Sequence, residues 1–378
     1  MAHFSHHLLA ALLTPLLPFI RDEFALDYTQ AGVLISSFTI SYGISQLPAG
    51  WFADRIGPRA LVVIGISGVA LFGLLIGLST TYIMMIIFMV LMGVMGGGYH
   101  PSSTPLVSVS VEPKNRGRAL GIHQIGGGAS YFLAPLIAVA ITTALGWRGV
   151  YIVVSVPTII FGIVLYVLLS RLGYAKKPRQ RITSHHTGAS LTTEHLRRLI
   201  PFFILAITFQ VFIYSITSFI PLFIVDQFDA SEETAAALLA LTYSGGLWAG
   251  PLGGYLSDRL GRIPVMLIMS LFASIIIYML NLASLGWSIS VLLFVIGTSM
   301  FITMPVAEAY IVSQSSERNL STILGIYYFA SRGGQGAIQP VLGYLIDRAG
   351  FQTTYTLMSA GLFMVTIGCS MFLWRNKD

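Results

Sequence analysis

Residues 50–59 read GWFADRIGPR, a charged turn between two long apolar segments, and residues 254–262 repeat the pattern as GYLSDRLGR. A helix that has been apolar for about twenty residues does not carry Asp54 and Arg55 side by side unless it has just left the membrane hydrocarbon. Each copy therefore marks an exit into water. Two copies predict two homologous halves.

The composition is that of a membrane protein. Of the 378 residues, 55% are hydrophobic and 10% are charged, whereas about a quarter of the residues in soluble domains carry charge. The sequence has no GxxxxGK[ST] loop, HExxH or paired CxxC motif, so we expect no ATP-pump phosphate loop, no metal and no cofactor. The net charge of +6 is spread over short loops, and we expect no nucleic-acid partner.

Twelve apolar spans of about 20 residues, separated by short polar turns, are predicted. They lie at 4–21, 30–52, 60–79, 82–108, 119–142, 149–170, 199–224, 234–256, 264–283, 288–313, 322–343 and 354–374. The only long polar insert runs from Arg171 to Arg198 and is predicted to link two sets of six helices. We therefore expect an all-α protein in a lipid bilayer, with six-helix bundles at 1–171 and 199–378 and a linker at 172–198.

Lys and Arg decide the sidedness. Seventeen of the 21 lie on the linker's side of the predicted membrane, whereas Arg21, Arg148 and Arg348 lie on the other and Arg332 lies inside a helix. Because positive residues collect in the cytoplasm, the linker and both termini are predicted to be cytoplasmic. The first span starts close to Met1, which suggests a longer native helix, and it lacks the basic region of a signal peptide. Short loops and the absence of targeting signals suggest a prokaryotic inner membrane.

The doubled pattern Gly-x-x-x-Asp-Arg-x-Gly, after the second and eighth spans, resembles the signature loop of the major facilitator superfamily of secondary transporters, and the likeness covers nearly the whole chain. The resemblance implies two pseudo-symmetric six-helix bundles that move a small-molecule solute by alternating access, and not an enzyme. It also implies a latch at the cytoplasmic side, made by Asp54, Arg55, Arg59, Asp258, Arg259 and Arg262. We expect a functional monomer, because the site lies within one chain.

The sequence motifs indicate the superfamily more specifically than the subgroup within it. Drug/proton antiporters of this superfamily carry an Arg four residues before a Gly in the fourth helix, where this chain has Met89 before Gly93. Their Gly-Pro pair in the fifth helix is replaced here by Ala134-Pro135. Residues 98–101 (GYHP) and 121–128 (GIHQIGGG) resemble fosmidomycin-resistance-like exporters and organic-anion carriers, which favours an anion.

Arg332 is the main candidate for binding the solute. It lies about ten residues into the eleventh span, where a charge costs about 2.5–3.5 kcal/mol to insert. Tyr328, Arg332, Gln335 and Gln339 share one helical face, and a fixed cation in a polar stripe suits an anionic or carbonyl-bearing solute. The alternative is that Arg332 pairs with Glu308 and only holds helices together.

Glu308 is the only carboxylate well inside a predicted span. Burial raises a carboxyl pKa and a nearby Arg lowers it, so this group could load and release a coupling proton as access alternates. A permanent ion pair with Arg332 is the other interpretation.

Histidines and polar stripes complete the set of candidate residues. His100, beside Tyr99, and His123, beside Gln124, would bind solute or relay protons, or else serve as packing residues. His3, His6 and His7 fall at i, i+3 and i+4, a spacing that could gather a metal, but we expect solvated or anchoring histidines there. In the seventh span, Gln210 and Tyr214 share one face as a hydrogen-bonding wall or as glue between helices.

Two other functions compete with anion transport. An aromatic cavity of Tyr99, Tyr214, Tyr243 and Tyr327 would suit efflux of amphiphilic drugs. A membrane sensor that keeps the fold without transporting would need an appended signalling domain, and the linker and tails are too short to be one.

Overall fold

The computed structural model describes residues 1–171, 193–315 and 320–374, and every regular element in these ranges is a helix. The first bundle holds α1 (Ala2–Ala11), α2 (Leu13–Phe24), α3 (Tyr28–Ile56), α4 (Pro58–Gly77), α5 (Tyr82–Gly96), α6 (Tyr99–Val109), η1 (Pro113–Asn115) and α7 (Arg116–Arg171). The second bundle holds α8 (Thr193–Phe228), α9 (Glu232–Tyr243), η2 (Ser244–Leu247), α10 (Ala249–Leu260), α11 (Arg262–Met279), η3 (Leu280–Leu282), α12 (Trp287–Gln314) and α13 (Leu320–Trp374).

The twelve predicted spans are confirmed in this helix order. α1 with α2, α5 with α6, and α9 with α10 each form one interrupted span, whereas α7 and α13 each contain two. The joints inside α7 and α13 are Gly146 (φ 67°, ψ 173°) and Gly350 (φ 75°, ψ 171°). By length and hydropathy, eight described stretches are long and apolar enough to cross a membrane, among them Arg118–Arg171 and Ile323–Leu373.

The two charged turns that define the sequence repeat have the same backbone. Gly57 has φ 88° and ψ 146°, and Gly261 has φ 88° and ψ 151°. Only glycine adopts this conformation without strain, and each glycine ends one helix and starts the next. The repeat seen in the sequence is therefore also a repeat of local structure.

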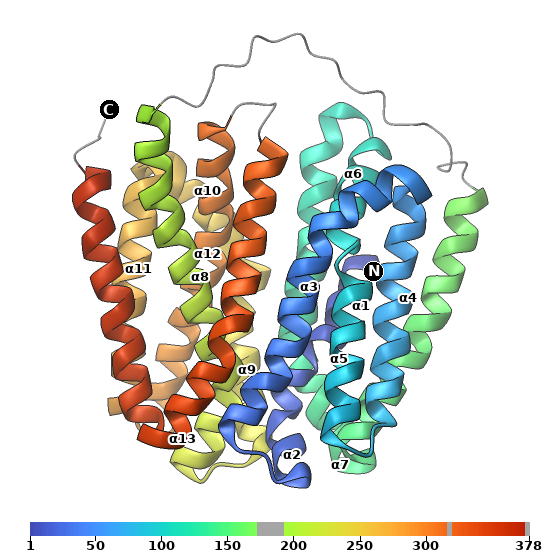
Figure 1. The fold of residues 1–378 in the computed structure, drawn as a ribbon, viewed down its shortest axis with the longest axis horizontal. Helices are drawn as coiled ribbons and strands as arrows, with labels where there is room; N and C mark the ends of the chain where they lie inside the picture. The colour runs from blue at the N-terminus through green and yellow to red at the C-terminus, as the bar shows by residue number, and fades with distance from the viewer. Residues whose placement is uncertain (172–192, 316–319, 375–378) are drawn as a thin grey trace.

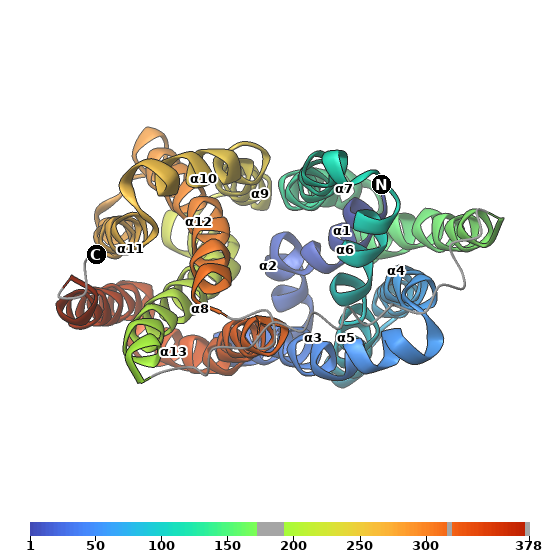
Figure 2. The same cartoon turned by 90° about the horizontal axis from the view of Figure 1, so that it is seen from above.

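The helices before residue 171 and those after residue 193 form two groups side by side (Figure 1). Seen from above, α3 lies against α13 along one seam, and α7 lies near α9 along the other (Figure 2). Small residues permit both contacts: a methyl group on Gly32 of α3 would overlap the backbone of Gln339, and one on Gly128 of α7 would overlap that of Gly246. Close backbone approach through glycine is typical of membrane helices.

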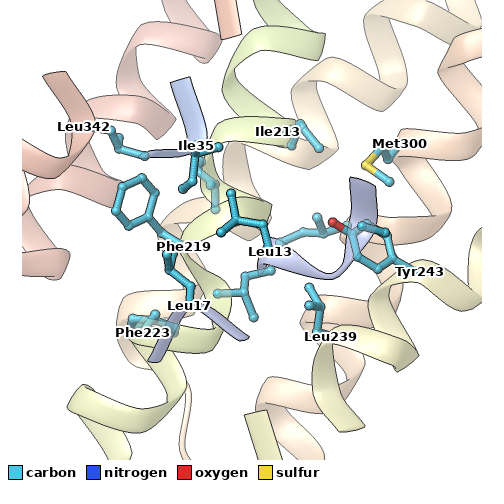
Figure 3. Packing of buried hydrophobic residues seen from close by; sticks show 14 of the residues in the cluster. Leu13, Leu17, Ile35, Ile213, Phe219, Phe223, Leu239, Tyr243, Met300 and Leu342 are labelled. Atoms are coloured by element: carbon cyan, nitrogen blue, oxygen red, sulfur yellow. The ribbon is translucent and has the colours of Figure 1, made fainter. Parts of the chain in front are cut away.

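We call the end of the molecule where α7 stops and α8 starts the linker end, and the other the far end. Apolar side chains from both bundles pack into one buried cluster that runs through the molecule, and Figure 3 shows part of it. Leu17, Phe219 and Leu239 in this cluster are fully buried, so the bundles are joined here by a dry core. We call Leu17, Phe219 and Leu239, which lie in the half of the molecule toward the far end, the apolar plug.

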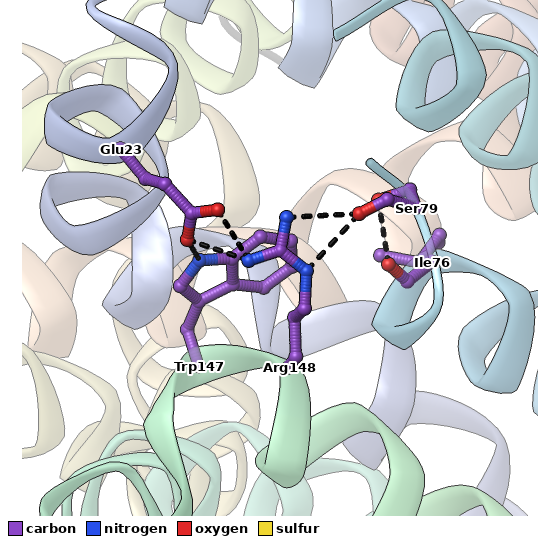
Figure 4. Close-up of polar contacts among 5 residues, drawn as sticks. All are labelled: Glu23, Ile76, Ser79, Trp147 and Arg148. Carbon is purple, nitrogen blue, oxygen red and sulfur yellow. Dashed lines mark hydrogen bonds and ion pairs between the residues drawn. The ribbon is translucent and has the colours of Figure 1, made fainter. Parts of the chain in front are cut away.

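Arg148, just after the Gly146 joint, fastens the far end of the first bundle (Figure 4). Its Nη1 donates to Glu23 Oε1 and Oε2 at 2.5 and 2.6 Å, and its Nε and Nη2 donate to the Ser79 carbonyl at 3.0 and 2.9 Å. Trp147 Nε1 also donates to Glu23, at 2.6 Å. One arginine thus ties the ends of α2, α4 and the second half of α7 together.

Candidate functional site

A hollow between the two bundles lies directly on the linker side of the apolar plug. Leu13, Ile35 and Tyr243 line the hollow and also belong to the buried apolar cluster. The polar lining of the hollow comes from seven helices and consists of His7, Thr14, Thr39, Tyr42, Tyr131, Tyr214, Ser218, Tyr243, Arg332 and Gln335. The cavity volume is about 70 Å³, far below the roughly 300–1,000 Å³ of pockets that hold organic ligands. The structure therefore shows a closed-up site that would have to widen to admit a solute.

Arg332 is the only charged side chain among the residues that line this hollow. Its guanidinium carbon lies 5.4 Å from the centre of the Tyr214 ring, and its Nη1 lies 3.4 Å from Gln335 Oε1. Gly43 of α3 lets the first bundle approach, because an added methyl group there would lie 3.2 Å from Arg332 Cβ. Among the described residues, Arg332 has no carboxylate partner within ion-pair distance.

Glu308 is not the partner of Arg332, so that alternative from the sequence is wrong for this conformation. Glu308 Oε1 accepts a hydrogen bond of 2.8 Å from the Tyr328 hydroxyl. Neither Glu308 nor Tyr328 lines the hollow. The predicted stripe on α13 is thus divided, with Tyr328 beside the acid and Arg332 and Gln335 at the hollow.

Two other candidates form cross-ties inside the second bundle. Gln210 Nε2 donates to the Tyr327 hydroxyl at 2.7 Å. Gln339 Nε2 donates to Ser218 Oγ at 3.2 Å, and Gln339 is fully buried. In this conformation both glutamines hydrogen-bond α8 to α13.

The expectation that the first histidines are solvated is wrong. His3, His6 and His7 are only 5%, 1% and 8% exposed. The turn at Leu12 sets α1 at the centre of the first bundle, where it packs against α7 and α4. His3 stacks on His123 with ring centroids 4.2 Å apart, and His7 Nε2 lies 3.0 Å from His100 Nε2.

Five histidines and Tyr99 therefore form one aromatic cluster, of which only His7 lines the hollow. His6 stacks on Tyr99 at 4.2 Å and has partners for both ring nitrogens, the Gly65 carbonyl at 3.1 Å and the Tyr42 hydroxyl at 3.5 Å. Gln124, predicted to act beside His123, is exposed and does not line the hollow.

The predicted latch residues lie at the linker end. The side chain of Asp54 lies outside the described part of the structure. Arg55, Arg59 and Arg259 lie over aromatic rings of their own bundles, Trp51 at 3.8 Å, Tyr166 at 5.2 Å and Tyr255 at 4.9 Å. Asp258 is exposed and Arg262 is partly buried.

The far end carries bonds between the bundles that the sequence did not reveal. Arg21 pairs with Asp226, and the Tyr28 hydroxyl donates to the same carboxylate at 2.6 Å. Asp347 accepts from Tyr28 N at 2.9 Å, Thr29 N at 2.8 Å and Thr29 Oγ1 at 2.6 Å.

We call these five residues the far-end clasp. Asp347 caps the start of α3 from the other bundle, next to that helix's own capping box from Asp27. The sequence does show a charged pair, Asp347-Arg348, at the end of the eleventh span. No local pattern indicates that Asp347 would bind the start of α3.

Comparison with known proteins agrees with this architecture. The chain is 22% identical to the multidrug resistance protein MdtG of Dickeya zeae, over 97% of this chain and 91% of that protein. It is 23% identical to the hexuronate transporter of Bacillus subtilis, over 91% of this chain and 86% of that protein. A crystal structure of a POT family transporter in complex with 5-aminolevulinic acid superposes with a TM-score of 0.84 at 14% identity, covering 100% of this chain and 95% of that one. The sequence model of the Major Facilitator Superfamily matches residues 1–338. Because this match covers most of the chain and the fold agrees with it, the chain belongs to that family.

Proposed function

We propose that this transporter carries a small organic anion, with Arg332 as the anchor for its negative group. The chain is a membrane transporter of small solutes and not an enzyme, as its family membership shows. The observation that carries the anion proposal is a lone arginine in the wall of the inter-bundle hollow, without a carboxylate partner among the described residues. A buried cation without a counter-ion is costly, and an anionic solute would supply the missing charge.

Gln335, Tyr214 and His7 would complete the site. Gln335 lies 3.4 Å from the guanidinium and Tyr214 lies beneath it, so both would hold Arg332 in a fixed orientation. Amide, hydroxyl and imidazole groups donate hydrogen bonds to carboxylate oxygens. The similarity to a hexuronate transporter supports a solute of this charge.

Transport would proceed by alternating access, with the linker end in the cytoplasm and the protein acting as a monomer in the inner membrane. The far-end clasp and the apolar plug close one side in this conformation. Asp54, Arg55, Arg59, Asp258, Arg259 and Arg262 would close the linker end when the far end opens. Solute binding would shift the balance between these two states.

Glu308 would carry the coupling proton. Its one hydrogen-bond partner among the described residues is the neutral Tyr328 hydroxyl, and no cation pairs with it in this conformation. An acid in such surroundings can gain or lose a proton when water reaches it in one state and not in the other.

The test is ligand-induced stabilisation of the purified transporter. Wild type, Arg332→Gln and the matched control Arg348→Gln would be heated with sugar acids, other small carboxylates, and uncharged analogues of each. A ligand that binds only the folded state raises the melting temperature. We expect one carboxylate class to stabilise wild type and the Arg348 variant and to leave the Arg332 variant unchanged. Equal stabilisation of all three proteins would refute Arg332 as the anchor.

Efflux of amphiphilic compounds is the second candidate, favoured by four tyrosines in the hollow. They are Tyr42, Tyr131, Tyr214 and Tyr243. Of the four tyrosines predicted from the sequence, Tyr99 and Tyr327 lie outside the hollow. The similarity to a multidrug resistance protein supports this reading. Stabilisation by many unrelated lipophilic cations, retained in Arg332→Gln, would establish it and exclude the anion proposal.

A further inference from the structure

Three histidines of the first bundle converge next to the hollow. His3 and His7 lie on α1, and His100 lies on α6. One ring nitrogen from each lies within 4.8 Å of the others. All three rings are buried or partly buried, so this proximity is built into the packing of α1, α6 and α7 and is not a chance meeting of surface side chains.

His3 is oriented in the way typical of a metal-binding histidine. Its Nδ1 lies 2.7 Å from the backbone carbonyl of His123. A carbonyl only accepts, so Nδ1 carries the hydrogen and Nε2 holds a lone pair. That Nε2 is buried and has no hydrogen-bond partner. A backbone carbonyl behind one ring nitrogen, which leaves the other free, is the usual outer-shell support of a metal ligand.

His7 and His100 present two nitrogens to the same point. Their Nε2 atoms lie 3.0 Å apart. Two nitrogens bound to one tetrahedral Zn²⁺ at about 2.0–2.1 Å would lie about 3.4 Å apart, so a shift of a few tenths of an ångström would let one ion replace the contact between this pair. His3, whose ring nitrogen lies within 4.8 Å of the others, would have to move closer to complete the site. The Tyr131 hydroxyl lies 3.4 Å from His7 Nδ1 and would support that ring from behind.

We propose that His3, His7 and His100 bind one divalent transition-metal ion through their Nε2 atoms. Three neutral imidazoles favour Zn²⁺, Ni²⁺, Co²⁺ or Cu²⁺ over Mg²⁺ and Ca²⁺, which prefer oxygen ligands. Arg332 lines the same hollow as His7, and its charge opposes a dication. The site therefore favours an ion whose bonds to nitrogen are strong enough to outweigh this repulsion.

The ion would leave one coordination position for a water or another small ligand. Three protein ligands and an open fourth position are typical of zinc sites that act on a bound molecule rather than only stabilise a fold. His7 belongs both to the cluster and to the lining of the hollow. A metal here would therefore sit at the boundary of the transport site.

The experiment measures metal binding directly, without any solute or transport. Protein freed of its affinity tag is stripped with a chelator and titrated with Co²⁺, whose visible absorption reports nitrogen coordination, and the Co²⁺ is then competed off with Zn²⁺. Wild type is compared with His3→Gln, His7→Gln and His100→Gln. The control is His6→Gln, because both His6 ring nitrogens already have protein partners.

We expect one ion per chain in wild type and in the His6 variant, and affinity reduced at least about tenfold in each of the other three. Melting temperature without metal identifies any variant that fails to fold, and the remaining variants decide the result. Absence of Co²⁺ absorption in wild type, or equal affinity in all folded variants, would refute the site. The role of Arg332 as anion anchor is tested separately, by ligand-induced stabilisation and not by metal binding, so the two proposals can fail independently.

Discussion

The far-end clasp predicts that Asp347 sets the balance between the two states of the transporter. The Asp347→Ala change removes three hydrogen bonds, from Tyr28 N, Thr29 N and Thr29 Oγ1. All three join one bundle to the other, so they exist only while the far end is closed. Losing them should therefore favour conformations open at the far end.

The magnitude follows from the exposure of these groups. Hydrogen bonds to a charged acceptor are worth about 1.5–3 kcal/mol when protected from water. Asp347 is exposed, so water replaces part of each bond and about 0.5–1 kcal/mol per bond is reasonable. Three bonds give about 1.5–3 kcal/mol, which shifts the equilibrium between closed and open far ends roughly ten- to a hundredfold.

The assay is a distance distribution between spin labels on the two bundles. Thr80 and Glu233 are exposed positions at the far end, one in each bundle, and both would be labelled as cysteines in a Cys369→Ala background in lipid nanodiscs. The Asp347→Ala variant should show a larger long-distance population than its parent. The control is Asn281→Ala, because the Asn281 amide bonds to Gln352 and Thr356 of its own bundle. Distributions that are identical in Asp347→Ala and its parent would refute the role of the clasp.

Three further results are expected. Glu308→Gln should make solute flux into vesicles independent of an imposed pH gradient, and a flux that still follows the gradient would exclude Glu308 as the proton carrier. Arg148→Gln loses the bonds to Glu23 and should lower the free energy of unfolding by about 1–2 kcal/mol, seen as a lower melting temperature in detergent; an unchanged one would contradict the tie. Gly297→Ala should abolish folding, because its methyl group would overlap a neighbouring backbone carbonyl, whereas Gly368→Ala, in open space, should behave as wild type; a folded Gly297 variant would contradict the packing.

The fold could be predicted because the membrane makes strong demands on sequence. Each span must be apolar for about 20 residues, and each exit is marked by charge. The doubled motif at residues 50–59 and 254–262 then shows the repeat. The breaks inside two spans, at Leu12 between α1 and α2 and at η2 between α9 and α10, could not be predicted, because glycine and proline are common within membrane helices that stay continuous.

The candidate site could be predicted only in part. Arg332, Gln335 and Tyr214 were found because a polar group deep in an apolar helix is conspicuous. Periodicity says which residues share a face but not what faces them, so it could not separate Glu308 from Arg332 or place Gln210 and Gln339 as cross-ties. The burial of His3 was unexpected because residues near a chain start are normally solvated.

The apolar plug has a consequence for the proton permeability of the membrane. Leu17, Phe219 and Leu239 are fully buried and belong to the same apolar cluster as the hollow's Leu13, Ile35 and Tyr243 (Figure 3), and a passage lined only by such groups expels water. A broken water file cannot conduct protons along hydrogen-bonded chains. The membrane should therefore keep its electrochemical gradient while the transporter is closed at the far end and holds no solute. Leu17→Asn would be expected to dissipate that gradient without any solute present.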